Sequence, residues 1–403
     1  MGGAAAEEGD LGGRDPRLDG LRGLAIALVV LYHTTHYALA RGAFARALTV
    51  VPSLGWSGVD LFFVLSGFLI TGILLRARTS PSYFGSFYAR RVLRIFPLYY
   101  AVLLLVLVIV PHIAFFSLFD DFWNPGAKRQ GIWYWLYLSN LKVALAGAWQ
   151  HQLLDITWSL SIEEHFYLLW PLAVRRCSER TLIAICAATA AGALALRVAL
   201  LAAGAPTVAI YALTPCRLDT LATGAAIAIA AARPGGLDAL ARPARRLLPI
   251  ALIAFLGCFA WVRLHMPPIE GARGWQAATV KELSFTTHPA ILTAGFSLLC
   301  VVYGALLVSV LTAPAGAWRA RAFEAPWLRR LGKYSYGVYL LHLIAAYALV
   351  QFLPPGRYPQ HFLIVQLLFW ALAFAGSYGL ARLSWAVLEE PMLRLKRYFP
   401  YVL

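Results

Sequence analysis

The chain has 403 residues, of which 60% are hydrophobic and only 13% are charged. Soluble globular proteins have about 45–50% apolar and about 25% charged residues, so the composition excludes a soluble enzyme, a disordered chain and a disulfide scaffold. The net charge of +16 comes from short basic clusters between apolar runs. This pattern is typical of cytoplasmic loops in membrane proteins, so we expect an all-α membrane protein with no nucleic-acid partner.

Apolar segments of membrane-spanning length follow one another along the chain. A transmembrane helix needs about 17–25 mostly apolar residues. With ten spans, most Lys and Arg residues lie on the side of the amino terminus, which the positive-inside rule places in the cytoplasm. We expect residues 1–16 to form a flexible cytoplasmic tail, residues 17–391 the membrane domain and residues 392–403 a second cytoplasmic tail. The ten expected spans are 21–39, 54–75, 95–114, 158–175, 181–203, 217–232, 247–265, 288–312, 331–353 and 361–388.

An eleventh segment, residues 131–147, is aromatic rather than uniformly apolar. Counting it as a span would move the basic cluster Arg175–Arg180 to the outside, against the positive-inside rule. Its Trp and Tyr side chains suit a membrane interface, so we expect a re-entrant or interfacial piece. The five cysteines are scattered and lack metal-ligand spacing, which predicts neither a metal site nor a disulfide framework.

The first span carries Arg22 and His33, which are 11 residues apart. At 3.6 residues per turn they share one helix face, about 16 Å apart along the axis. Arg22 would lie at the cytoplasmic edge and His33 deep in the outer half. The alternatives are a histidine bonded to a neighbouring carbonyl and an arginine that only anchors the helix at the interface.

The second span carries Asp60 at a depth comparable to that of His33. A carboxylate at that depth must be protonated or paired, and a His33–Asp60 pair would also fix the imidazole tautomer. Alternatively, Asp60 caps a backbone break near the flanking glycines. Both interpretations place Asp60 at the same level as the histidine.

The third span begins near Arg91 and Arg94, which share a helix face because they are three residues apart. Together with Arg22 they could bind a multiply charged anion such as a nucleotide phosphate. The alternative is lipid headgroup binding or a purely topological role.

The fourth span opens with Trp158 and Ser159 and then places Glu163, Glu164 and His165 in a row. Helical rise puts these three ionisable groups about 8–11 Å from the outer end. Successive residues point about 100° apart, so only one or two can face a common centre. Further polar residues open the sixth span or lie in the ninth, namely Arg217, Asp219, Tyr336 and His342. Arg217 could neutralise Glu163 or Glu164.

These residues predict group transfer across the membrane. An anionic donor would bind Arg22, Arg91 and Arg94, and its reactive end would reach His33, the general base for an acceptor hydroxyl. Asp60, Glu163 and Glu164 would assist catalysis, and the candidates for substrate contact are Trp158, Ser159, Arg217, Asp219, Tyr336 and His342. The rival mechanism forms a covalent acyl-histidine. The rival function is a proton-coupled transporter of acyl or polar solutes, which would also use buried His and carboxylate groups.

Five ordered motifs resemble those of the bacterial integral-membrane acyltransferase family 3, over about residues 17–391. They are Arg22-x10-His33, the run Gly58–Phe68, Arg90-Arg91-x-x-Arg94, Trp158-Ser159-Leu160-x-x-Glu163-Glu164 and Ser335-Tyr336-x-x-Tyr339-x-x-His342, with Glu389-Glu390-Pro391 closing the match. His165 departs from the pattern, since the family commonly has Gln there. This departure leaves the hydrogen bonding around Glu164 open.

The resemblance implies ten membrane helices in a bacterial inner membrane and O-acylation, often O-acetylation. The implied donor is acyl-CoA, with no metal, and the implied acceptors are sugars of lipopolysaccharide, exopolysaccharide, glycolipid or peptidoglycan-linked material. A macrolide or another small hydrophobic acceptor is the alternative. The resemblance also implies that Arg22 and His33 are essential and that Arg91 and Arg94 contact the donor. Some relatives carry a further hydrolase-like domain, and we expect transfer here to finish within the membrane domain.

Overall fold

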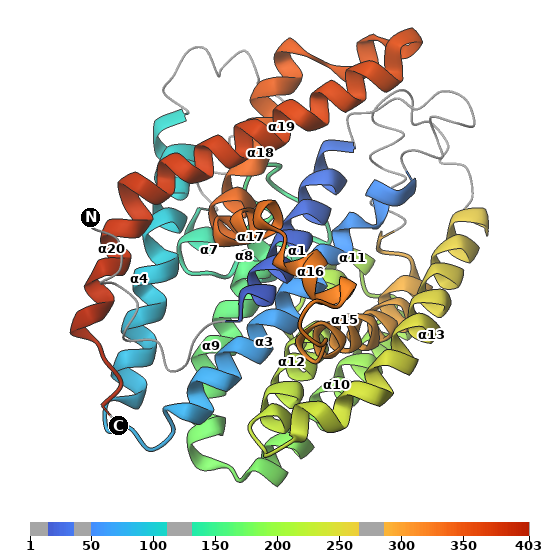
Figure 1. Ribbon diagram of the computed structural model, residues 1–403. Coiled ribbons are helices and arrows are strands. Elements are labelled where there is room, and N and C mark those ends of the chain that lie inside the picture. The colour runs from blue at the N-terminus through green and yellow to red at the C-terminus, as the bar shows by residue number, and fades with distance from the viewer. Residues whose placement is uncertain (1–14, 36–49, 111–130, 266–285, 403) are drawn as a thin grey trace.

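The computed structural model describes residues 15–35, 50–110, 131–265 and 286–402, and all regular elements in these ranges are helical (Figure 1). Helices suit a membrane because their backbone N–H and C=O groups bond within the segment. The long helices are α1 (Pro16–Thr35), α3 (Gly58–Arg76), α4 (Tyr83–Leu103), α9 (Thr157–Arg176), α10 (Glu179–Ala202), α12 (Leu218–Ala231), α13 (Gly236–His265), α15 (Phe296–Leu311), α18 (Ser335–Phe352) and α19 (Phe362–Ser384).

Shorter helices and tighter or wider helical turns connect the long ones. The short α-helices are α7 (Ile132–Trp135), α8 (Ser139–Ala146), α11 (Thr207–Ala212), α16 (Trp318–Glu324), α17 (Pro326–Lys333) and α20 (Glu390–Arg394). The 3₁₀ and π segments are Leu54–Ser57, Leu104–Ile109, Thr214–Cys216, Ile291–Gly295, Pro355–Arg357, Pro359–His361, Trp385–Glu389 and Leu395–Tyr398.

All ten expected spans coincide with helices, apart from residues 36–39 and 111–114, which lie outside the described ranges. In the part of the chain that the structure describes, seven helical stretches are long and apolar enough to cross a membrane. The other three are α12, with only 14 residues, and α1 and α9, whose apolar character is reduced by the polar residues singled out above. The chain is therefore a multi-pass membrane protein, while the count of ten and the cytoplasmic termini stay predictions.

Segment 131–147 is not one long helix. It consists of α7 and α8, separated by Tyr137, whose φ of 55° lies in the left-handed region. Gly147, at φ 64°, ends α8 in the same region, where a glycine has no steric penalty. The structure thus agrees with the prediction that this segment does not span the membrane as a single helix.

The two expected tails differ in what the structure describes. Residues 1–14 lie outside the described ranges. In the expected tail of residues 392–403 the helical path continues to Tyr398, and the hydroxyls of Ser82 and Ser86 donate hydrogen bonds to the carbonyl of Pro400. This end of the chain therefore packs on the first turn of α4.

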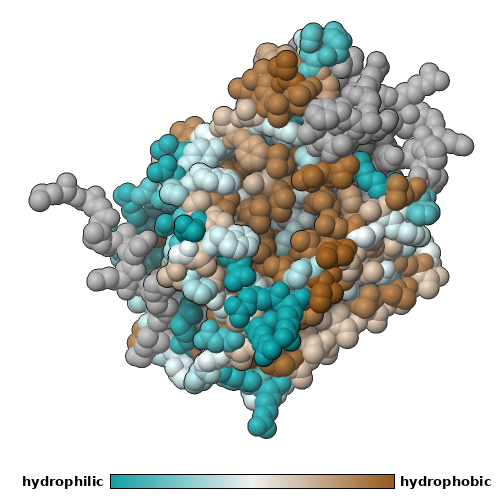
Figure 2. All heavy atoms as spheres, turned by 45° about the vertical axis from the view of Figure 1, so that its right-hand side comes forward, coloured by the Kyte–Doolittle hydropathy of each residue, from teal (hydrophilic) through white to brown (hydrophobic). Residues whose placement is uncertain are grey.

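The central elements are α1 and α3, with α10, α12 and α13 on one side and α4 and α19 on the other (Figure 1). The closest packed pairs are α3 with α12, α1 with α17, α13 with α15 and α18 with α19. Figure 2 shows hydrophobic side chains over much of one face, with a hydrophilic area lower in the view. Helices α13 and α19 carry exposed leucines and isoleucines, which suits contact with lipid. Ile253 and Ile364, for example, are each 70% exposed.

The contact between α3 and α12 depends on two glycines. A Cβ at Gly67 would lie 2.0 Å from the Leu221 carbonyl oxygen, and one at Gly224 would lie 1.9 Å from that of Val64. Both contacts are with backbone, so the helices would have to separate. We expect Gly67→Ala or Gly224→Ala to lower the free energy of unfolding by about 1–3 kcal/mol, measured as thermal stability in detergent.

Gly192 of α10 is the matched control, because a Cβ there would meet nothing within 4 Å. Gly192→Ala should be neutral or stabilising by up to about 1 kcal/mol, since alanine favours a helix over glycine. Equal effects of all three substitutions would contradict the interpretation that close approach of α3 and α12 requires the glycines.

Candidate active site

Two histidines from distant parts of the chain meet at the centre of the site. His33 of α1 and His342 of α18 have ring centroids 4.9 Å apart, and His342 Nε2 lies 3.1 Å from His33 Nδ1. His342 is fully buried, whereas His33 is only partly buried. The Nδ1 atom of His33 also lies 3.0 Å from the Val29 carbonyl oxygen, as in the alternative of a histidine bonded to a neighbouring carbonyl.

The expected His33–Asp60 pair is not formed. Asp60 is fully buried and accepts a hydrogen bond from Arg217 Nη2 at 2.7 Å. The Arg217 guanidinium lies 3.6 Å from the centroid of the Phe296 ring, and Trp158 is a further neighbour. Arg217 therefore neutralises Asp60 rather than Glu163 or Glu164, because α12 packs against α3.

A second buried ion pair lies next to the first. Asp219 accepts a hydrogen bond from Arg197 Nη1 at 2.7 Å, and both side chains are almost fully buried. Arg217 and Asp219 were candidates for substrate contact, as was Trp158, which is 5% exposed and packs against Tyr211. In this structure all three lie in a closed cluster of ion pairs and aromatic rings, which suits a structural role.

Glu163 lies between the two halves of the predicted site. Its Oε1 atom accepts a hydrogen bond from Ser66 Oγ at 2.6 Å. The positive charges of Arg22 and Arg91 act on its carboxylate, and Tyr339, one turn before His342, is within range of its charge. Glu163 is therefore within electrostatic range of both the arginines and the helix that carries His342.

Glu164 faces the same region from the next position of α9. The charge of Arg91 acts on it, and its own charge acts on the hydroxyl groups of Tyr99 of α4 and Tyr336 of α18. The side chains of Glu163 and Glu164 are both partly accessible. Ser159 of the same helix donates to or accepts from Tyr339 Oη at 2.6 Å, which links α9 to the helix that carries His342.

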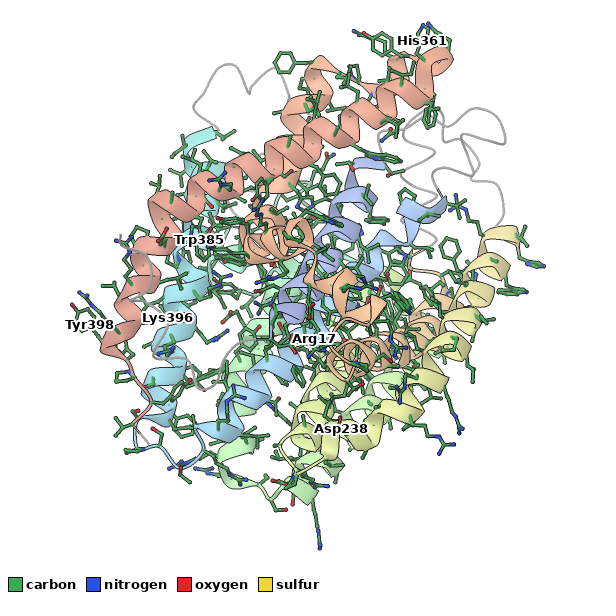
Figure 3. All side chains as sticks on the ribbon, in the orientation of Figure 1. Arg17, Asp238, His361, Trp385, Lys396 and Tyr398 are labelled. Carbon is green, nitrogen blue, oxygen red and sulfur yellow. The ribbon has the colours of Figure 1, made fainter. Side chains whose placement is uncertain are left out.

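Arg94 lies in a cluster of aromatic and acidic side chains. Its guanidinium is 5.4 Å from the Trp385 ring centroid, 5.9 Å from that of Tyr336 and 3.9 Å from Glu389 Oε2. Trp385 begins the π-helical segment Trp385–Glu389, which continues α19 and packs on α4 (Figure 3). Tyr336 Oη donates a hydrogen bond to the Ile95 carbonyl at 2.6 Å, which fixes α18 against α4.

The other two arginines complete this basic group. Arg91 shares the face of Arg94 on α4, and its Nε atom is buried with no hydrogen-bond partner among the described residues. Arg22 Nη1 lies 3.7 Å from Asp19 Oδ1 on the first turn of α1. Both charges act on Glu163, so Arg22 and Arg91 are near enough to this carboxylate to interact with it electrostatically.

The segment before α9 is held by one buried carboxylate. Asp155 accepts hydrogen bonds from the backbone N–H groups of Gln150 and His151 and from Tyr134 Oη, the last at 3.0 Å. Burial raises the pKa of Asp155 to about 6 and lowers the pKa of His151 to about 4. Lys142 Nζ lies 3.2 Å from Tyr134 Oη, so the loop carries its own polar core.

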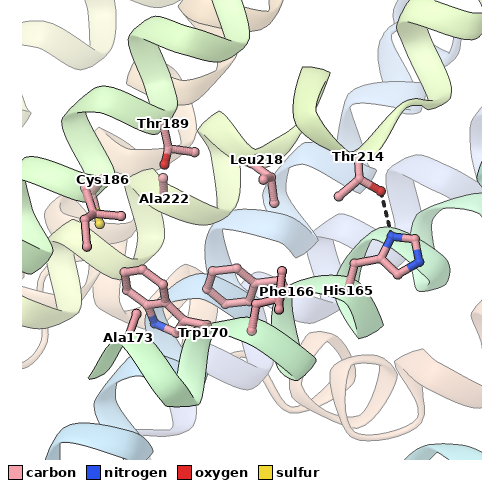
Figure 4. Close-up of a pocket in the computed structure, with 11 residues that line it drawn as sticks. His165, Phe166, Trp170, Ala173, Cys186, Thr189, Thr214, Leu218 and Ala222 are labelled. Atoms are coloured by element: carbon pink, nitrogen blue, oxygen red, sulfur yellow. Dashed lines mark hydrogen bonds between the residues drawn. The ribbon is translucent and has the colours of Figure 1, made fainter. Parts of the chain in front are cut away.

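His165, the departure from the family pattern, faces α10 and α12. It lines a pocket between these helices and α9, whose other walls are almost entirely apolar (Figure 4). Its Nδ1 atom lies 2.8 Å from Thr214 Oγ1. The hydrogen-bond partner of His165 Nδ1 is therefore Thr214 and not Glu164.

Comparison with known proteins decides the family. A profile of an acyltransferase domain matches residues 15–382. The chain belongs to this acyltransferase family. The match begins one residue before α1 and ends within α19, so it covers both histidines and all three arginines of the site.

Curated members of the family include O-acetyltransferases. The chain is 26% identical over 397 residues to the peptidoglycan O-acetyltransferase OatA of Listeria monocytogenes, covering 94% of this chain and 55% of that protein. It is 27% identical over 391 residues to the O-acetyltransferase OatA of Staphylococcus aureus, covering 94% and 57% respectively. The chain thus spans a little over half the length of these relatives. No solved structure matches it.

Several contacts of this candidate site were not predicted from the sequence. Ser66, Arg197 and Trp385 each bond or pack against a predicted residue. Arg197 gave a detectable signal, because a lone arginine in an apolar span must find a buried partner. Ser66 and Trp385 gave none, since polar and aromatic residues are common in spans. Within the described residues no group of His, Cys, Asp or Glu could hold a metal ion.

Proposed function

We propose that this protein is an O-acetyltransferase of the bacterial inner membrane that moves an acetyl group from cytoplasmic acetyl-CoA to a hydroxyl group of a peptidoglycan-type glycan. The observation that carries the proposal is the helix α1, which holds Arg22 and His33 on one face about 16 Å apart. Family membership and the names of the relatives support acetyl transfer to a glycan. The length of the α1 face is comparable to an extended thioester arm.

Arg22, Arg91 and Arg94 would bind the phosphates of the donor. Guanidinium groups suit phosphate because several N–H donors meet its oxygen atoms at once. The unpartnered, buried Nε of Arg91 supports this role, since a buried donor without an acceptor costs free energy that a ligand would recover. The aromatic rings of Trp385 and Tyr336 beside Arg94 offer a surface on which a nucleobase could stack.

The reaction needs one proton acceptor near the thioester. His33 Nε2 takes the proton of the acceptor hydroxyl as its oxygen forms a bond with the acyl carbonyl carbon. The tetrahedral intermediate then collapses, the carbon–sulfur bond breaks, and the leaving thiolate takes the proton back from His33. Glu163, whose carboxylate interacts with the charges of Arg22 and Arg91 and with Tyr339, would orient the donor.

The test uses the full-length protein in lipid nanodiscs with radiolabelled acetyl-CoA and soluble peptidoglycan fragments. We expect base-labile label on the glycan. Lipopolysaccharide sugars, exopolysaccharide and a macrolide are run as alternative acceptors. Movement of label across proteoliposomes with no ester on any acceptor would instead support a transporter.

The arginine cluster should govern the affinity for the donor. Arg91→Gln should raise the KM for acetyl-CoA by about 10- to 100-fold, since a hydrogen bond to a charged group contributes about 1.5–3 kcal/mol. Arg90→Gln is the matched control, because Arg90 is the adjacent residue of α4 but contacts the Phe399 carbonyl and Tyr401 instead. Steady-state kinetics with acetyl-CoA as the varied substrate separate the two. Similar KM values for both variants would remove Arg91 from the donor site.

A further inference from the structure

The pair of histidines has a defined hydrogen-bond direction. A carbonyl oxygen can only accept, so His342 Nδ1, 2.7 Å from the Tyr339 carbonyl oxygen, carries a proton. His33 Nδ1, 3.0 Å from the Val29 carbonyl oxygen, carries one for the same reason. A neutral imidazole has a single N–H group. His342 Nε2 is therefore the acceptor for His33 Nδ1–H at 3.1 Å, and the lone pair of His33 is on Nε2.

We propose that His342 is a positioning residue, which holds His33 with Nε2 as its basic nitrogen and shares the charge when Nε2 takes a proton. The inference rests on the proposed function and assigns to His342 a role other than substrate contact. The burial of the two rings supports it, because His342 is fully buried behind the partly accessible His33. Because its ring has no accessible surface, His342 cannot touch the glycan in this conformation, but it can hold the imidazole of His33.

His342 adds something that the Val29 carbonyl alone does not. An acceptor on the same helix restricts the His33 tautomer, whereas a second acceptor from α18 also fixes the tilt of the ring. When His33 becomes an imidazolium, its Nδ1–H bond becomes charge-assisted and stronger. The stabilisation is therefore larger in the transition state than in the ground state, and it should act on kcat rather than on the KM for the donor.

The chain contains an internal reference for this argument. His265 Nδ1 lies 2.8 Å from the carbonyl oxygen of Trp261, four residues earlier in the same helix. His33 makes the same kind of contact with the carbonyl oxygen of Val29. His265 is exposed and belongs to α13, far along the chain from the paired histidines. It thus reports the effect of an own-helix carbonyl without a second imidazole.

The test combines two substitutions of His342 with nitrogen NMR of the whole protein labelled with ¹⁵N-histidine. His342→Leu removes the acceptor, and His342→Gln places an amide oxygen near the position of Nε2. We expect His342→Leu to lower kcat by about 10- to 100-fold, since a hydrogen bond to a charged group contributes about 1.5–3 kcal/mol, with an unchanged KM for acetyl-CoA. His342→Gln should recover most of the loss, and His265→Ala should have no effect.

The NMR signals separate this inference from the proposed function, because they need no turnover. The His33 resonances, assigned by difference with His33→Ala, should show a protonated Nδ1 and an unprotonated Nε2 in the wild type. In His342→Leu the Nδ1 resonance should shift toward that of His265, whose acceptor is an own-helix carbonyl. A protonated Nε2 in the wild type, or a full kcat in His342→Leu, would overturn the role of His342. Absence of any acyl transfer with the predicted signals intact would overturn only the proposed function.

Discussion

Replacing His33 with alanine should lower the rate of acetyl transfer by about 10²–10⁴-fold, the usual contribution of a general base. The side chain is partly accessible on a helix that is otherwise largely buried, so its loss removes a reactive group with little effect on packing. Donor affinity should persist, because Arg22 and Arg91 are unchanged. The measurement is the initial rate of ester formation at saturating acetyl-CoA, together with thermal stability of the same preparation.

The same preparation distinguishes the general base from an acyl-histidine. Wild-type protein is incubated with labelled acetyl-CoA in the absence of acceptor, denatured, and examined for bound label. A general base leaves no label on the protein, whereas a nucleophilic His33 leaves label that disappears in His33→Ala. Undiminished transfer by His33→Ala would exclude both mechanisms, because each of them uses His33 as the reactive group.

The face shared by Arg22 and His33 could be predicted from the sequence because it depends on helix geometry alone. α1 is continuous from Pro16 to Thr35, so a spacing of 11 residues fixes both the direction and the separation of the two side chains. The sequence also marked Asp60, Arg217 and Asp219, since polar residues in apolar spans are costly and stand out. These predictions need no knowledge of how the helices pack.

The partners of the buried charges could not be predicted, because they depend on which helix faces which. Asp60 has the depth of His33, but α3 packs on α12 through Gly67 and Gly224, and this contact brings Arg217 to Asp60. His342 was selected as a polar residue of a late span, and only the packing of α18 near α1 shows that it meets His33. The depth of a residue along its helix can be counted from the sequence, whereas the neighbouring helix that its face meets cannot.

Replacing Arg217 with methionine should lower the free energy of unfolding by about 3–5 kcal/mol, because Asp60 would be left as an unpaired buried charge. Its Oδ2 atom already lacks a hydrogen-bond partner among the described residues, so Arg217 is its main source of neutralisation. Asp60→Asn should lower the free energy of unfolding by a similar amount, because it leaves the Arg217 guanidinium as an unpaired buried charge. The double variant Asp60→Leu/Arg217→Met should recover much of the loss, since it removes both charges together. Thermal or denaturant unfolding in detergent measures the three stabilities.

The ion pair of Glu179 and Arg233 is the matched control. Its atoms are 3.0 Å apart, but its side chains are 44% and 50% exposed, so breaking it should change the stability by less than about 1 kcal/mol. The comparison also decides between two roles of Asp60. If Asp60 only neutralises Arg217, the double variant regains stability and transfers acetyl groups at a near-normal rate per folded molecule. If Asp60 instead acts on His33, the double variant folds but stays inactive, and the catalytic assignment made from its depth in the membrane is restored.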